Sequence, residues 1–317
     1  MTARASLTAR QVRSRRSAKP AVDPSRPAAA FWEDERSREG SVAPVLTVLL
    51  TGAECPFTCV YCDLWRGTID GETSPGAIPA QIRATINNCG DLPGGAAIKL
   101  YNHSNFFDAR AVPPQDDAGI AELVAPFTCV TVECHPNLIG PRCVEFAARL
   151  DGRLEVAMGL ETVHPDALAQ LNKGMTVADF DRAAGELRRH GIGVRAFVLV
   201  SPPFVAPAES VEWAVRSVQH ALECGAQHVS LIPVRGGNGI MEELERDGAF
   251  VPPTLSQLED ALDHCLSLGG VVTADLWDVE RVSQCRVCAS TRRARLARIN
   301  LSGKPEPRVA CAECGGR

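Results

Sequence analysis

The stretch from Cys55 to Cys62 reads CPFTCVYC and places three cysteines in the spacing C-x3-C-x2-C. Iron–sulfur clusters are normally held by four thiolates, so a four-iron cluster bound here would keep one iron open to another ligand. The alternatives are a zinc site or a set of unrelated buried cysteines. Structural zinc sites have four protein ligands, and the loop offers no fourth, since the nearest downstream histidine is His103. The spacing therefore favours an iron–sulfur cluster with an open iron.

Alternating strand and helix patterns follow this loop along the chain. Short β-rich runs separated by helical stretches predict parallel βα units in an α/β fold. The expected strands are 45–50, 97–101, 129–133, 154–160, 194–200, 228–233 and 271–276. The expected helices are 76–89, 116–124, 140–149, 176–190, 208–223 and 254–269. The cysteine loop directly follows the first strand, and in βα barrels the chemistry lies at the carboxyl ends of the strands.

The cysteine run, with the aromatic Tyr61 directly before its last cysteine, resembles the signature of the radical SAM superfamily. The resemblance implies a partial (β/α)6 barrel of the TIM type, here over residues 31–278. It also implies that Cys55, Cys59 and Cys62 hold a 4Fe-4S cluster whose open iron is chelated by S-adenosylmethionine (SAM). The implied reaction is reductive cleavage of SAM to methionine and a 5′-deoxyadenosyl radical, with a reduced flavodoxin or ferredoxin as the electron donor.

The loop after the second expected strand departs from the superfamily pattern. Members usually carry a Gly-Gly-Glu there, which binds the amino group of SAM, whereas this chain has Asn102-His103-Ser104. We predict that Asn102 and Ser104 bind the cofactor in its place, through backbone or hydroxyl contacts. The position of Tyr61 contributes its backbone to adenine recognition in the superfamily, so Tyr61 is a further expected cofactor contact.

Charged residues at other strand ends complete the predicted site. Glu133 and Glu161 end the third and fourth strands, and we predict that both are catalytic and cofactor-binding residues, with carboxylates that accept from the ribose or ammonium of SAM. Arg195 in the fifth strand and Arg235 after the sixth can grip a carboxylate bidentately. The alternative for each is an ordinary polar start of a solvated loop.

Two further segments resemble one particular subgroup of this superfamily. Gly159–Thr162 and Leu171–Thr176 resemble the elongator-type and methylthiotransferase-type subgroup. Together with the stretch Lys99–Asp108 and the C-terminal cysteine pairs, they resemble the radical SAM (beta) subunits of archaeosine synthases. The implied function is lyase chemistry on a tRNA base. The alternatives are a radical SAM enzyme of small-molecule or peptide natural-product biosynthesis and, in another class, a non-catalytic metal-binding or RNA-binding protein.

The C-terminal segment 279–317 carries a second group of cysteines. Two C-x2-C pairs supply four thiolates, enough for a tetrahedral zinc ion: Cys285, Cys288, Cys311 and Cys314. We favour zinc, and a second iron–sulfur cluster is the alternative. Four arginines between the pairs either contact phosphate or form a solvated basic face: Arg292, Arg293, Arg295 and Arg298.

Composition limits the remaining choices. The chain has 317 residues, 45% of them apolar and 22% charged, and its net charge of −5 gives no global argument for nucleic-acid binding. No apolar run approaches the roughly 20 residues of a membrane helix. Thirteen cysteines without a secretory signal favour reduced thiols in the cytoplasm. Residues 1–30 form a basic arm that we predict to be disordered, with RNA binding or a transit peptide as alternatives.

Overall fold

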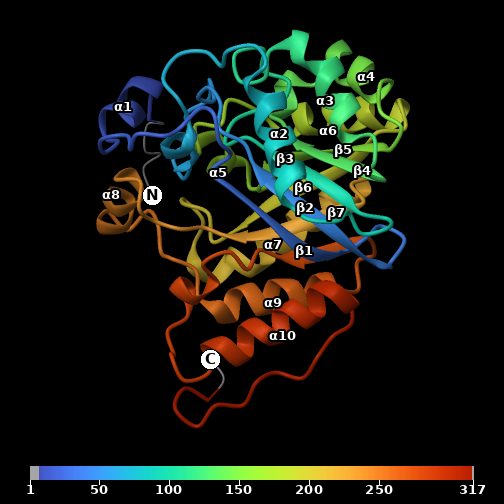
Figure 1. Cartoon of the computed structure of the whole chain (residues 1–317). Helices are drawn as coiled ribbons and strands as arrows, with labels where there is room; N and C mark the ends of the chain where they lie inside the picture. The colour runs from blue at the N-terminus through green and yellow to red at the C-terminus, as the bar shows by residue number, and fades with distance from the viewer. Residues whose placement is uncertain (1–6, 316–317) are drawn as a thin grey trace.

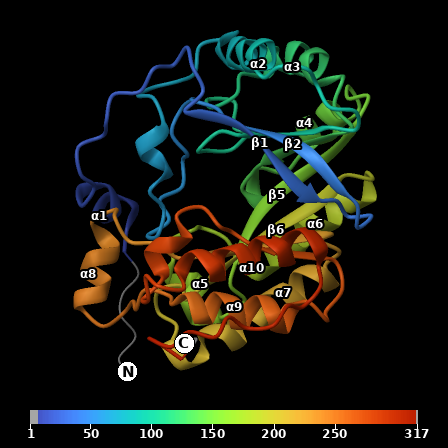
Figure 2. The same cartoon turned by 60° about the horizontal axis from the view of Figure 1, so that its bottom comes forward.

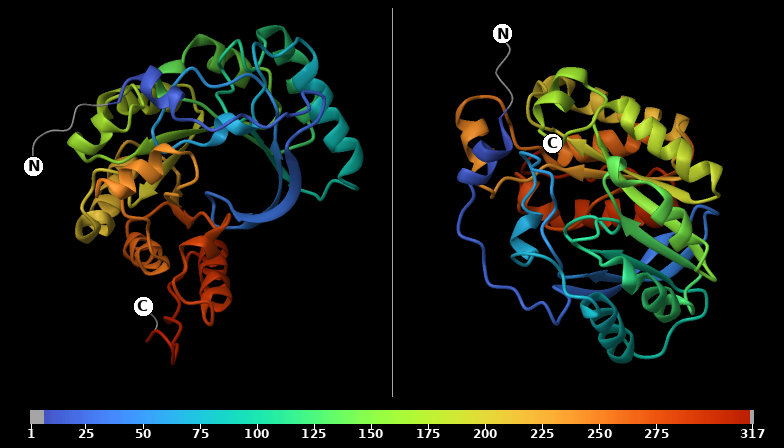
Figure 3. Two further views of the ribbon diagram at one scale, coloured as in Figure 1. Left: turned by 90° about the vertical axis from the view of Figure 1, so that its left-hand side faces the viewer. Right: turned by 90° about the horizontal axis from the view of Figure 1, so that it is seen from above.

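The computed structural model describes residues 7–315 and contains an eight-stranded sheet in the order β1 to β8. β1 pairs antiparallel with β2, and each later pair of neighbours is parallel. The strands are β1 (Ala29–Arg36), β2 (Val42–Leu49), β3 (Ala97–Tyr101), β4 (Cys129–Glu133), β5 (Arg153–Glu161), β6 (Gly193–Val200), β7 (His228–Pro233) and β8 (Val271–Ala274). The sheet curls into a partial barrel (Figure 3), which confirms the predicted fold class.

Most of the helices cover the outer face of this sheet. The longer ones are α1 (Ala9–Ser14), α2 (Ala77–Asn88), α3 (Asp117–Val124), α4 (Pro141–Ala147), α5 (Pro165–Gln170), α6 (Val177–Arg189), α7 (Ser210–Glu223), α8 (Ile240–Arg246), α9 (Leu255–Cys265) and α10 (Ala289–Ser302). Short 3-10 turns are η1 (Leu64–Gly67), η2 (Pro114–Asp116), η3 (Pro136–Leu138), η4 (Pro207–Glu209) and η5 (Val279–Val282). Because both faces of the parallel strands are covered, strands such as β6 are buried almost throughout. Within residues 7–315, no helix combines the length and apolar character needed to cross a lipid bilayer.

The C-terminal helix α10 closes the side of the barrel. It packs against β1 and β8, the two edge strands of the sheet, and lies beside α9 at the bottom of Figure 1. The side-chain amide of Asn300 accepts a hydrogen bond from the N–H of Ala274 at 2.9 Å and donates one to its carbonyl at 2.8 Å. Asn300 thus satisfies backbone groups at the free edge of β8, which would otherwise lack a neighbouring strand.

The N-terminal arm differs from the predicted disorder over its described part. α1 begins with a capping box between Thr8 and Gln11, and Val12 is buried in a small apolar cluster with residues of α8. Arg15 pairs with Glu243 of α8 at 2.7 Å, and α1 and α8 lie side by side in Figure 2. The basic composition did not predict this order, because the cations of the arm pair with carboxylates on segments distant in the sequence. Residues 1–6 of the predicted arm lie outside the described residues.

Candidate metal and cofactor sites

The cysteine loop follows β2 at the carboxyl end of the strand and is fixed by asparagine side chains from three other segments. Each amide donates to the loop: Asn105 to Cys55 Sγ at 3.1 Å, Asn172 to the Thr58 carbonyl at 2.8 Å, and Asn238 to the carbonyls of Val60 at 2.7 Å and Cys62 at 3.2 Å. The backbone N–H of Val60 donates to the carbonyl of Leu171 at 3.0 Å. The loop geometry is therefore set by the fold rather than by the loop alone.

The three thiols of this loop do not converge on one point as the ligands of a single ion would. In the described part of the chain, the groups of three or more donor atoms lying within 4.8 Å of one another do not include Cys55, Cys59 and Cys62. A single zinc ion would need such convergence, with Zn–S bonds of about 2.3 Å. Burial raises the pKa of all three thiols, that of Cys59 to about 12. The geometry suits a multi-iron cluster, in which each thiolate binds a different iron.

A buried ion pair lies beside the loop. The Lys173 ammonium donates to the Glu161 carboxylate, and both side chains are almost fully buried. Burial lowers the pKa of Lys173, but the charge and hydrogen bond of Glu161, together with the nearby thiols of Cys59 and Cys55, more than offset this effect and raise that pKa. The Tyr61 hydroxyl also hydrogen-bonds to Glu161, and burial raises the pKa of Tyr61. A β-carbon at Gly159 would overlap both charged groups, so this glycine makes room for the pair.

The loop after β3 contains polar atoms that lack partners. Glu133 accepts the backbone N–H of Asn102 at 2.7 Å and those of His103 and Ser104, while burial raises its pKa to about 7. The amide nitrogen and oxygen of Asn102 and the hydroxyl of Ser104 are buried without a hydrogen-bond partner. Since unpaired buried polar atoms are rare, a polar cofactor fits this position. The Glu133 carboxylate thus orders the loop by binding the loop's backbone N–H groups. Direct contacts of Glu133, Asn102 and Ser104 with a cofactor stay predictions.

The two predicted arginines pair with carboxylates of the chain. Arg195 is the third residue of β6 and forms a bidentate pair with Glu35 at 2.7 and 2.9 Å and a bond to Glu155 at 2.8 Å. Its guanidinium is therefore committed to carboxylates of β1 and β5, and the structure does not bring it to the cysteine loop. Arg235 follows β7 and pairs with Asp275 at 2.7 Å and with the Trp277 carbonyl, so it joins the ends of β7 and β8.

Sequence reasoning missed the residues that hold the loop. The asparagine clamps and Lys173 belong to segments noticed only as polar strand ends or family-like motifs. A stacked pair was also missed: the rings of Phe57 and His135 lie 3.6 Å apart at 13°. His135 Nε2 faces the Lys173 carbonyl at 3.0 Å, and burial together with the Lys173 charge lowers the pKa of His135 to about 3. The neutral imidazole therefore packs on Phe57 inside the loop.

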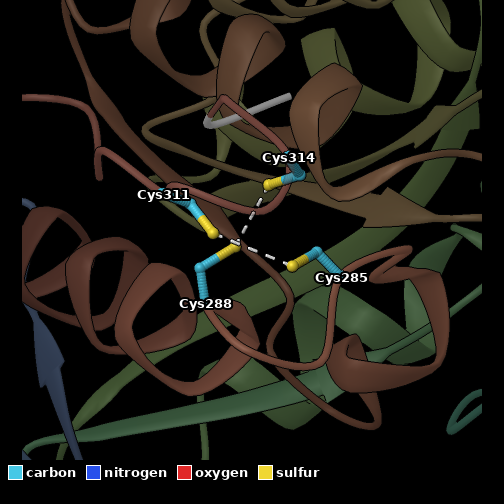
Figure 4. A group of neighbouring side chains, drawn as sticks. All are labelled: Cys285, Cys288, Cys311 and Cys314. Carbon is cyan, nitrogen blue, oxygen red and sulfur yellow. Dashed lines mark hydrogen bonds between the residues drawn. The ribbon is translucent and has the colours of Figure 1, made fainter.

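The four C-terminal cysteines converge on one point (Figure 4). Their sulfur atoms all lie within 4.8 Å of one another, with Cys285 3.9 Å from Cys311 and Cys288 3.6 Å from Cys314. A tetrahedral ion with metal–sulfur bonds of about 2.3 Å would separate its sulfurs by about 3.8 Å. Backbone N–H groups of Cys314 and Glu313 lower the pKa of Cys311 to about 7. These four thiols could hold a metal ion.

The arginines between the cysteine pairs do not form an open basic face. Each pairs with a carboxylate of the same chain: Arg292 with Glu259 at 2.6 Å, Arg293 with Glu280 at 3.0 Å, Arg295 with Asp263 at 2.8 Å, and Arg298 with Glu306 at 2.8 Å. The side chains of Arg292 and Arg295 are only 2% and 1% exposed. Neither phosphate binding nor a solvated face describes these two residues, which join α10 to α9.

Comparison with solved structures shows which proteins share this fold. The fold matches the archaeal Methanocaldococcus infernus Elp3 with TM-score 0.51 and 14% identity, over 71% of this chain and 59% of that one. It matches Streptococcus suis SuiB bound to S-adenosylmethionine with TM-score 0.53 and 13% identity, over 77% of this chain and 52% of that one. These are radical SAM enzymes, so the chain has the radical SAM fold.

Sequence comparison gives a particular relationship within that class. The chain is 24% identical to archaeosine synthase subunit beta of Methanosarcina acetivorans, over 96% of this chain and 91% of that protein. It is 26% identical to the subunit of the same name from Thermococcus kodakarensis, over 59% of this chain and 61% of that protein. No protein-family model matches the chain. The chain is thus a distant homologue of archaeosine synthase beta subunits, which confirms the predicted resemblance.

Proposed function

We propose that this protein is a radical SAM enzyme with a 4Fe-4S cluster on Cys55, Cys59 and Cys62. The observation that carries the proposal is a set of three partly buried thiols that do not converge on one point, held on a clamped loop at the carboxyl end of β2. When bound, such a cluster supplies the electron that cleaves SAM to methionine and a 5′-deoxyadenosyl radical. The unpaired atoms of Asn102 and Ser104 support a bound polar cofactor beside it.

In this proposal the chain's own residues position and shield the reacting groups. Asn105 donates to the sulfur of Cys55, and a hydrogen bond to a ligand sulfur tunes a cluster. The ion pair of Glu161 with Lys173, whose charges cancel, occupies the space beside Cys59 and keeps water out of it. A reduced flavodoxin or ferredoxin supplies the electron, and the free thiols of all thirteen cysteines fit a reducing cytoplasm.

SAM cleavage tests this proposal. Anaerobically reconstituted protein should show the absorption and EPR signal of a four-iron cluster and form 5′-deoxyadenosine with dithionite. Cys59→Ala should abolish both and keep the C-terminal metal. Cys89→Ala is the matched control, since this thiol hydrogen-bonds to the carbonyls of Ile86 and Gly90 and belongs to neither metal site, so both signals should stay intact. Absence of 5′-deoxyadenosine from cluster-loaded wild-type protein would leave only the non-catalytic metal-binding or RNA-binding alternative.

For the substrate we propose a base of tRNA. The support is the homology to archaeosine synthase subunit beta, which spans nearly the whole of both chains. Phosphate contacts give a steep dependence of affinity on salt, so tRNA affinity should fall sharply as salt rises. The second candidate is a small molecule or peptide, supported by the fold match to SuiB, which has been solved bound to the precursor peptide SuiA. Salt-independent or absent tRNA binding would favour this candidate.

For the four-cysteine site we propose zinc rather than a second cluster. The support is that all four sulfurs approach one another closely enough to share a single ion. Metal analysis of cluster-free protein should find zinc, and Cys311→Ser should hold one zinc per chain fewer than wild type. Iron and sulfide that persist after substitution of Cys55, Cys59 and Cys62 would instead identify a second cluster.

A further inference from the structure

A third group of donor atoms lies on the outer helical layer. Asp181 of α6 faces His220 of α7 and Cys224, the residue that caps the carboxyl end of α7. His220 Nε2 lies 2.7 Å from Asp181 Oδ1, and the Cys224 thiol donates to the same oxygen at 3.2 Å. Cys224 Sγ is 3.5 Å from His220 Nε2. One sulfur, one nitrogen and one oxygen therefore converge on a single point.

The arrangement differs from that of a nucleophilic Cys-His-Asp triad. In such a triad the acid binds one ring nitrogen and the nucleophile faces the other. Here the carboxylate and the thiol both face Nε2 of His220, so the acid competes with the thiol for the same ring atom. Donors that meet at one point serve a cation better, because they can all bind it at once.

The local fold presents these donors together. His220 and Cys224 are four residues apart and so lie on one face at the end of α7, while Asp181 lies across from them on α6. Arg188 of α6 donates to the Cys224 carbonyl at 3.2 Å and holds the end of α7. Gly225 permits this contact, since a β-carbon there would overlap the Arg188 side chain. The donors are partly exposed, which leaves room for water as a further ligand.

We propose that Asp181, His220 and Cys224 bind a divalent transition-metal ion such as Zn²⁺. A thiolate, an imidazole and a carboxylate are ligands of this ion, and a water molecule completes four coordination. On binding, the Cys224 thiol releases its proton to solvent, and the two anionic ligands balance the two positive charges. The site is separate from the cysteine loop and from the four-cysteine site, and it does not depend on the proposed radical chemistry.

Zinc stoichiometry of the full-length protein tests the proposal. After reconstitution of the iron–sulfur cluster, the protein is dialysed to equilibrium against micromolar free Zn²⁺, and bound zinc is measured by mass spectrometry. Wild-type protein should hold one more zinc per chain than His220→Gln and than Cys224→Ser. His190→Gln is the matched control. This exposed histidine caps the end of α6, the helix that carries Asp181, and its Nε2 lies 3.2 Å from the carboxylate of Glu186. It should keep the full zinc content.

Thermal unfolding supplies an independent readout. Added Zn²⁺ should raise the melting temperature of wild-type and His190→Gln protein more than that of His220→Gln. Circular dichroism establishes that each variant is folded. If Cys224→Ser does not fold, Asp181→Asn takes its place in the comparison. Equal zinc content in wild type and His220→Gln, with equal thermal shifts, would overturn the proposal and leave the three residues as a hydrogen-bonded contact between α6 and α7.

Discussion

Removing the cation of the buried Lys173–Glu161 pair should be among the most damaging single changes to this chain. Lys173→Met keeps the length of the side chain but leaves the Glu161 carboxylate buried, with the Tyr61 hydroxyl as its remaining partner. Breaking a buried ion pair by deleting one partner costs about 3–5 kcal/mol, because an uncompensated charge stays in a low dielectric. The stability of a domain is only about 5–15 kcal/mol, so the change should be plain in any unfolding curve.

Urea unfolding of cluster-free protein, followed by circular dichroism, measures this change without interference from cluster loss. The double variant Lys173→Met with Glu161→Gln removes both charges and should recover more than half of the lost stability. Lys304→Met is the control, because Lys304 is exposed and surface changes of this kind usually stay within about 0.5 kcal/mol. In reconstituted protein, Lys173→Met should also bind less iron, since it places an unpaired negative charge beside Cys59.

Two results would refute this reasoning. A loss below about 1 kcal/mol in Lys173→Met would mean that water reaches the carboxylate and that the pair is not buried as the structure has it. A double variant no more stable than the single one would mean that Lys173 acts through its aliphatic packing rather than through its charge.

Three further outcomes follow from the same structure. Gly159→Ala should lower the unfolding free energy by about 1–3 kcal/mol and reduce cluster content, because its β-carbon overlaps the ion pair; iron analysis and urea melts check this. The pKa of Glu133 is raised to about 7 from 4.5, so the folded state binds more protons than the unfolded state between these values. Stability should therefore fall by about 3 kcal/mol as pH rises through that window, and Glu133→Gln should flatten the slope of pH-dependent urea melts. Asn300→Ala should cost about 1–3 kcal/mol and speed hydrogen exchange at the edge of β8, where its amide bonds Ala274.

Three strands have the bounds that the sequence predicted: β3, β4 and β7. Their sequences AIKLY, CVTVE and HVSLIP are short runs rich in β-branched and other apolar residues with few polar ones, as expected for parallel strands that are mostly buried. β1 was missed because its sequence, AAFWEDER, looks like a polar loop. Two of its carboxylates instead face the barrel interior, where Glu33 and Glu35 pair with Lys99 at 2.9 and 3.0 Å. The same interior network takes up Arg195, which a strand pattern alone could not distinguish from a ligand contact.

The site was predictable where the chemistry lies within one short segment and not where it depends on distant partners. The cysteine spacing indicated the cluster loop directly. Asn238, in contrast, donates to a carbonyl 178 residues earlier in the chain, and no sequence signal marks a carbonyl as an acceptor. The relation between Gly159 and Lys173 is similar, since both stood in recognisable motifs but the reason for the glycine is steric and three-dimensional.

The position of α10 indicates a structural role for the four C-terminal cysteines. Cys288 is the residue that precedes the first turn of α10, and the chain returns after the helix to Cys311 and Cys314. An ion on all four thiols would tie the start of α10 to the segment that follows it, and α10 packs on both edge strands of the barrel. Arg292 and Arg295 turn inward to α9. These two arginines therefore stabilise the packing of α10, which closes the barrel, and the case for a tRNA substrate depends on homology rather than on the basic residues of segment 279–317.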